Sequence, residues 1–196
     1  MLHISISEEV ATACPDLHVL VLSCDVCNSE PDERLWQEIA DEEKVVRETV
    51  KLEQINKWLP IQATRQAYKR LGKDPNRYRP SSEALRRRIL RELPLYKVDT
   101  LVDLINLVSI RSGYSIGGFD ADKIAGGSLV LGVGREGEVY HGIGRGELNI
   151  AGLPVYRDAV GGVGTPTSDE ERTKIGLDTT LSLIHISEPT RLRRIS

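Results

Sequence analysis

The clearest pattern of apolar and polar positions predicts a helix that begins after Pro80 and ends before Pro94. Its apolar side chains recur every four residues, which places them in one narrow buried stripe. That stripe consists of Leu85, Ile89 and Leu93. Ser81 is the predicted N-cap, because the proline before it blocks extension and its hydroxyl oxygen can accept a backbone hydrogen bond.

A second helix, Thr100–Ser112, is apolar almost all round, so we expect it to be central in the domain. Gly113 follows at the position that favours a left-handed backbone. Asp103 and Asn106 interrupt the apolar surface three residues apart and therefore share a face. Two interpretations remain open: both side chains hydrogen-bond a neighbouring loop, or Asn106 faces a binding site.

The other elements follow from simpler patterns. Helical periodicity covers two earlier segments, Glu33 to about Lys57 and Ile61–Leu71. Alternating or continuous apolar runs predict a short edge strand and four further strands. These are His3–Ser7, the buried strand Leu17–Leu22, Ser128–Val133, Leu148–Ile150 and Leu153–Arg157. Val160–Ser168 is predicted to be a flexible loop. Helices and strands without regular βαβ alternation indicate the α+β class.

Two short motifs suggest chemistry that their context does not support. Gly132–Gly137 matches GxGxxG, but we expect Glu138–Tyr140 to continue as a strand, whereas a phosphate cradle needs a helix there. We therefore interpret it as a hairpin turn. Cys24 and Cys27 form a lone CxxC without a second pair or nearby histidines. We expect no metal and no cofactor, and a reducing cytoplasmic compartment.

Residues 181–191 read LSLIHISEPTR, which resembles the translation of a sequencing-library adaptor. We therefore expect residues 181–196 to be a non-native tail outside the fold, and the native domain to be C-terminally truncated near Thr180. Residues 1–180 are then a single domain, with a helical part at about 31–95 and a strand-rich part at about 114–180.

Charge is balanced over the chain but sorted locally. Without residues 181–196, which hold three arginines and one glutamate, 23 basic and 28 acidic residues remain, a formal charge of −5. That charge, with no signal peptide and no long apolar run, gives no reason to expect DNA or a membrane as partner. Residues 65–91 nevertheless hold ten basic and two acidic residues. This segment either contacts RNA phosphates or pairs with the acidic helix before it.

Four motifs together resemble a known family. They are YRPSSEAL at 78–85, TLVDLIN at 100–106, GYSIGGFDAD at 113–122, and VYRD at 155–158 with Gly161 and Gly162 after it. The family is the editing (B-three/B-four) domain of the bacterial phenylalanyl-tRNA synthetase β subunit and its free-standing relatives. The resemblance covers about residues 60–180. It implies a β-sandwich of unusual topology flanked by helices in three layers.

The resemblance also implies a site and a partner. Asn106 matches the family's pocket asparagine, while Gly117 stands where the family has a histidine, and a family acidic residue would fall near Asp178. The implied substrate-binding residues are Asn106, Gly117, Gly118, Gly161 and Gly162. The implied RNA-binding residues are Arg79, Arg86, Arg87, Arg88 and Arg91. The partner would be charged tRNA with its amino-acid moiety.

Two functions remain open from the sequence. The domain either hydrolyses mischarged aminoacyl-tRNA in trans, or it is a non-catalytic amino-acid-binding or protein-binding module on the same fold. The first needs a group that positions water and moves a proton, and the glycine at position 117 has no side chain for that task. The sequence identifies no catalytic residue.

Overall fold

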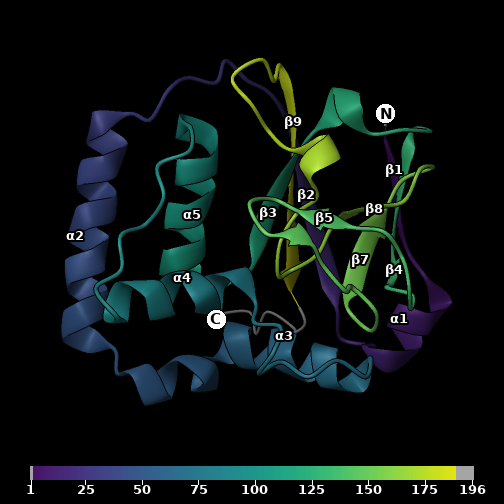
Figure 1. Cartoon of the computed structure of the whole chain (residues 1–196), viewed down its shortest axis with the longest axis horizontal. Coiled ribbons are helices and arrows are strands. Elements are labelled where there is room, and N and C mark those ends of the chain that lie inside the picture. Colours follow the sequence, from purple (N-terminus) through teal and green to yellow (C-terminus); the bar gives the residue numbers. More distant parts are fainter. Residues whose placement is uncertain (1, 189–196) are drawn as a thin grey trace, which may run out of the picture.

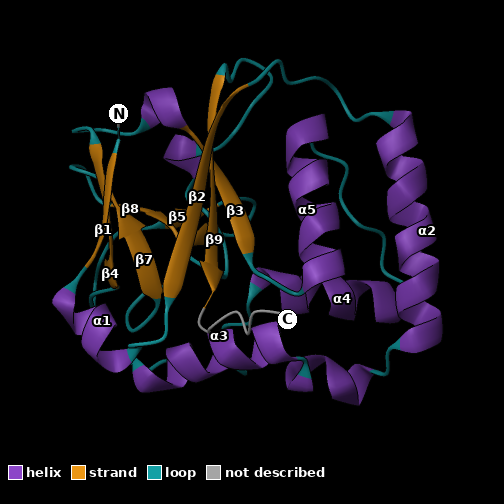
Figure 2. Cartoon of the chain, turned by 180° about the vertical axis from the view of Figure 1, so that it is seen from behind, coloured by secondary structure: helices purple, strands orange, loops and turns teal. Residues whose placement is uncertain are grey.

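Two β-sheets packed face to face, with helices over the outer face of one of them, make three layers (Figure 1). The computed structural model describes residues 2–188. A layer of helices lies beside the three-stranded sheet, and the four-stranded sheet forms the opposite side of the molecule (Figure 2). This mixed arrangement confirms the predicted α+β class with helices flanking a sandwich.

The four-stranded sheet has the order β1-β4-β7-β8. Its strands are β1 (His3–Ile6), β4 (Ser128–Val133), β7 (Pro154–Arg157) and β8 (Gly162–Gly164). β1 runs parallel to β4, and the other neighbours are antiparallel. β1 lies at the edge, as its short alternating pattern predicts. A two-stranded ribbon stands apart, made of β5 (His141–Gly142) and β6 (Gly146–Glu147).

The three-stranded sheet has the order β2-β9-β3. Its strands are β2 (His18–Asp25), β9 (Leu181–Glu188) and β3 (Ile116–Asp120). β9 runs antiparallel to both neighbours and is therefore central. Residues 181–188 thus belong to the fold, contrary to our expectation that the chain after residue 180 lies outside it. Residues 189–196 of that segment lie outside the described residues.

The alternation of β9 explains its position. Leu183 and His185 point into the space between the sheets, where Phe119 is also buried. Ile184 and Ile186 point the other way and pack against the helical layer. A strand with apolar side chains on both faces fits a sheet that is covered on both sides. The sequence analysis did not predict this strand, because the resemblance of residues 181–191 to an adaptor led us to expect them outside the fold.

Five α-helices complete the described part of the chain. They are α1 (Glu8–Ala13), α2 (Glu33–Thr49), α3 (Leu59–Arg70), α4 (Ser81–Leu90) and α5 (Thr100–Ser112). Short 3₁₀ turns occupy Leu52–Lys57, Ala121–Lys123 and Glu171–Thr173. No helix among residues 2–188 is long and apolar enough to cross a membrane. α5 has the predicted bounds, with Asp99 accepting from the Val102 N–H and Gly113 at φ 79°.

Several local predictions are wrong. Pro80, not Ser81, is the N-cap of α4, and it provides no side-chain hydrogen bond. Residues 138–140 and 148–150 are not strands. β2 is an edge strand with exposed leucines at 20 and 22, not a buried one. The predicted flexible loop 160–168 is mostly buried and contains β8, because its glycines allow close packing against aromatic rings.

One carboxylate holds that segment in place. Asp158 accepts hydrogen bonds from both terminal nitrogens of Arg172, each at 3.0 Å, and from the N–H groups of Ala125, Val160 and Gly161. Burial opposes its ionisation, but these donors outweigh that cost and lower the pKa of Asp158. The VYRD motif with its following glycines is therefore a structural junction.

We predict that Asp158→Asn lowers the free energy of unfolding by about 2 kcal/mol at pH 7, since Arg172 is a third exposed and solvent weakens the pair. A carboxyl with a lowered folded-state pKa contributes its stability above the unfolded-state pKa of about 3.9 and loses it as pH falls further. The difference from wild type should therefore shrink below about pH 4. Urea unfolding across pH measures it, with the exposed Asp16→Asn as control; identical pH profiles for both variants would contradict the assignment.

Candidate substrate cavity and basic groove

A cavity of about 450 Å³ opens between α5, β3 and the segments around residues 165–169 and 174–177. Its walls are mainly apolar, with Val102 and Ile105 from α5 and Ile116 from β3. A few polar groups converge in it, chiefly Asn106, Ser115, Thr165, Ser168 and Asp169. An apolar cavity of this size with a few placed polar groups is typical of a small-molecule site.

Asn106 and Asp103 have different surroundings although they share a face of α5. The Trp36 indole N–H donates to Asp103 Oδ2 at 2.6 Å, and the Val98 N–H donates to its Oδ1 at 3.1 Å. Burial raises the pKa of Asp103, while these two donors partly offset that effect. Asn106 instead lines the cavity. Asp103 is therefore held by a neighbouring helix and loop, as the first interpretation predicts, whereas Asn106 borders a cavity.

The glycine pair of β3 brings its backbone against a carboxylate that the sequence analysis missed. Asp169 Oδ2 accepts the N–H of Gly118 at 3.1 Å. Because successive residues of a strand point their N–H groups to opposite edges, the N–H of Gly117 faces β9. Gly117 and Gly118 both line the cavity, but the donor on its side is Gly118. Asp169 follows an ordinary turn sequence, TPTS, so no sequence pattern marks it.

His185 of β9 lies behind this carboxylate. Its Nε2 is 3.4 Å from Asp169 Oδ1, and its ring stacks on Phe119 at a centroid distance of 4.6 Å. A Cβ added at Gly117 would lie 2.4 Å from His185 Nε2 and 2.3 Å from Asp169 Oδ2. The space for a side chain at position 117 is therefore already filled. His185 thus contacts Asp169 from the central strand of the three-stranded sheet.

The other two predicted pocket glycines lie elsewhere. Gly161 donates its N–H to Asp158, and Gly162 packs against the ring of Tyr140. Neither lines the cavity. Asp178 does not line it either. The structure therefore brings together Asn106, Gly117 and Gly118 and leaves the double glycine outside.

A groove of about 390 Å³ adjoins the cavity and is strongly basic. Among residues 2–188, no acidic residue lines it and six arginines do: Arg77, Arg79, Arg87, Arg88, Arg91 and Arg145. Ser81 and Asn106 line both the groove and the cavity, so the two spaces share a wall. The predicted pairing of this region with the acidic helix is not seen among residues 2–188, where the acids of α2 pair with Lys44, Arg47 and Arg111.

Four of the five predicted RNA-binding arginines line the groove, and Arg86 does not. Arg86 is buried, donates to the carbonyl of Ile110 and lies 3.4 Å from the centroid of the Trp58 ring. Burial lowers its pKa to about 10. These contacts join α4 to α5. Because the guanidinium of Arg86 is held by them inside the protein, it does not reach the groove.

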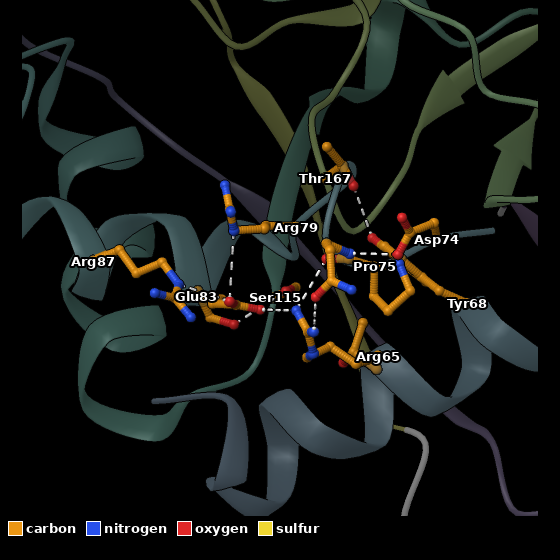
Figure 3. Close-up of polar contacts among 12 residues, drawn as sticks. Arg65, Tyr68, Asp74, Pro75, Arg79, Glu83, Arg87, Ser115 and Thr167 are labelled. Atoms are coloured by element: carbon orange, nitrogen blue, oxygen red, sulfur yellow. Dashed lines mark hydrogen bonds and ion pairs between the residues drawn. The ribbon is translucent and has the colours of Figure 1, made fainter. Parts of the chain in front are cut away.

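Glu83 lies among three arginines, two of which line the groove (Figure 3). Its carboxylate is fully buried and lies 2.8 Å from Arg65 of α3, 2.8 Å from Arg87 and 3.8 Å from Arg79. Arg65 also donates to the carbonyl of Pro75 and to the side chain of Asn76, which fixes the loop before α4. One buried carboxylate therefore holds two arginines of the groove.

The fold and site define an α+β domain with an apolar cavity beside a basic groove. The model of the B3/4 domain family matches residues 63–194, about two thirds of the chain, and the chain belongs to that family. This assignment confirms the predicted resemblance. No curated protein matched the sequence.

A crystal structure of an N-terminal fragment of the phenylalanyl-tRNA synthetase β subunit from Pyrococcus horikoshii is similar to this chain, with a TM-score of 0.47 and 14% sequence identity. The match covers 96% of this chain and 43% of that one. This chain therefore spans less than half the length of that fragment.

We predict that Glu83→Gln lowers the free energy of unfolding by about 3 kcal/mol, because it leaves three arginine charges without their buried partner. Thermal and urea unfolding measure the loss. Glu136→Gln is the matched control, since Glu136 is exposed in a turn outside the groove. Equal stability of the two variants would show that the cluster does not hold α3 against α4.

Proposed function

We propose that this domain is a cytoplasmic, tRNA-associated hydrolase that removes a wrongly attached amino acid from charged tRNA in trans. The observation that carries the proposal is that the apolar cavity and the basic groove share a wall. Ser81 and Asn106 border both an apolar cavity and a groove lined by six arginines. An amino acid esterified to the 3′ end of an RNA needs these two environments side by side, one for its side chain and one for the phosphates.

The groove arginines supply the phosphate contacts. Arg77, Arg91 and Arg145 are exposed and have no ion pair within residues 2–188, whereas Arg79 and Arg87 share Glu83. Phosphate binding by such side chains releases counterions and gives affinity that falls with salt. We assign tRNA binding to Arg77, Arg79, Arg87, Arg91 and Arg145.

Asn106 and Asp169 supply the chemistry in the cavity. The amide of Asn106 orients the aminoacyl group. Asp169 lines the cavity. Its Oδ2 accepts the N–H of Gly118, and its buried Oδ1 lies 3.4 Å from His185 Nε2 without a hydrogen bond among the described residues. We assign to this carboxylate the task of taking a proton from the attacking water. The water oxygen attacks the ester carbonyl carbon, the bond to the ribose oxygen breaks, and the proton passes from Asp169 to that ribose oxygen. In this proposal Asp169 supplies the proton-transfer group that position 117, a glycine, lacks.

We predict that the domain hydrolyses at least one member of a panel of misacylated tRNAs. Asp169→Asn should lower kcat by about 10²- to 10⁴-fold, because it removes a proton-transfer group. Asn106→Ala should lower kcat/KM by about three- to tenfold, the worth of one hydrogen bond. Release of radiolabelled amino acid measures both.

Thr179→Ser, a buried conservative change outside the cavity, is the control for both variants. Absence of hydrolysis across the whole panel would refute the hydrolase. Hydrolysis that is unchanged in Asp169→Asn would refute the role of that carboxylate alone.

We predict that Arg91→Ala weakens tRNA binding and reduces the slope of log K against log salt by about 0.7 to 0.9, the value of one phosphate contact. Arg34→Ala is the matched control, since Arg34 is exposed on α2 and does not line the groove. Filter binding at several salt concentrations measures the slopes. Equal slopes for the two variants would place the RNA elsewhere.

A non-catalytic amino-acid-binding module is the second candidate, and the glycine at position 117 favours it. Such a module would bind free amino acids in the cavity without cleaving an ester. A rise in melting temperature with a free amino acid, together with no hydrolysis of any charged tRNA, would support this function over the first.

A further inference from the structure

We propose that Tyr96 is a stacking platform for a base of the single-stranded 3′ end of the RNA, and that Arg88 positions its ring. The inference rests on the proposed function for the nature of the partner. It adds a means of recognising an unpaired nucleotide, and it gives Arg88 a role other than phosphate binding.

Tyr96 is unusually exposed for a large aromatic side chain. It lies in the loop between α4 and α5 with 69% of its surface accessible, and Leu93 beside it is 46% exposed. Both line the basic groove. An exposed aromatic ring in a groove bordered by arginines combines the two features by which proteins bind single-stranded RNA, namely a flat surface for a base and positive charge for the backbone.

Arg88 holds the ring from the protein side. Its guanidinium carbon lies 4.2 Å from the centroid of the Tyr96 ring, and its Nε–H donates to the carbonyl of Pro94. The guanidinium is therefore engaged with the loop and the ring, in contrast to exposed Arg91. Such a cation over an aromatic face fixes the ring while most of its surface stays open.

Tyr96 and the main cavity are linked through Asn106. A smaller cavity of about 200 Å³ beneath the loop is lined by Tyr96, Arg88 and Asn106. Asn106 therefore borders the space under the platform as well as the main cavity and the groove. A base on Tyr96 would belong to a nucleotide close to the esterified end, and bases there are unpaired and free to stack.

The test uses two short single-stranded RNA oligonucleotides with the full chain. One ends in a nucleotide bearing 2-aminopurine, and the other has a 3′-terminal nucleotide without a base. We expect 2-aminopurine fluorescence to be quenched on binding. Tyr96→Ala should weaken binding of the first oligonucleotide by about 5- to 150-fold and leave the second unchanged, because stacking on one base is lost. Tyr96→Phe should retain wild-type affinity for both.

The affinity for the oligonucleotide with a terminal base, divided by that for the one without, measures stacking. Arg88→Gln should lower this ratio to a value between those of wild type and Tyr96→Ala, because it removes the cation from the ring. Arg88→Lys, which keeps a cation, should restore the wild-type ratio. Leu59→Ala, an exposed apolar change on α3 outside the groove, should leave the ratio unchanged. Equal weakening of both oligonucleotides by Tyr96→Ala, or no quenching in the wild type, would overturn the platform.

Measuring hydrolysis of charged tRNA as well distinguishes failure of the Tyr96 platform from failure of the proposed hydrolase function. If the wild-type domain deacylates tRNA but the affinity ratio does not depend on Tyr96, only the platform is wrong. If it binds neither oligonucleotide and deacylates nothing, the proposed function fails together with the platform.

Discussion

The buried carboxylate of Glu83 is the interaction on which both the helical layer and the groove depend. A carboxylate taken fully out of water is costly unless it is paired, and here three arginines from α3, α4 and the loop between them surround it. The pairing fixes where these elements meet. It also places two of the groove arginines, Arg79 and Arg87, so the contact that joins α3 to α4 also positions part of the basic surface.

The net charge of the chain conceals this separation. The formal charge is −3, yet in the described part of the chain six arginines and no acidic residue line the groove. The acidic side chains of α2 are partly used by Arg111 on the central helix, at distances of 3.1 and 3.3 Å. Acidic and basic helices that are neighbours in sequence therefore do not cancel each other in space. The groove therefore keeps a local positive potential on a protein whose net charge is weakly negative.

The sequence was sufficient where local chemistry decides the structure. α5 has its predicted bounds because its apolar surface, its Asp99 cap and Gly113 all act within a few residues. It was insufficient where distant contacts decide. Arg86 points inward because Trp58 and the Ile110 carbonyl receive it, and Asp169 meets the Gly118 N–H across 51 positions of sequence. The buried glycine-rich segment at 160–168 was misjudged because its partners, Phe119 and Tyr140, come from other elements.

The glycine pair of β3 explains how a site of this kind can be built around a carboxylate. A Cβ at Gly117 would collide with Asp169, and a Cβ at Gly118 would lie 2.6 Å from Ile175. Without those atoms, the loop that carries Asp169 can approach the strand closely enough to accept a backbone hydrogen bond. A side chain on the strand and a carboxylate on the loop therefore exclude each other at this place. The glycine at position 117 is thus a condition for the observed position of Asp169.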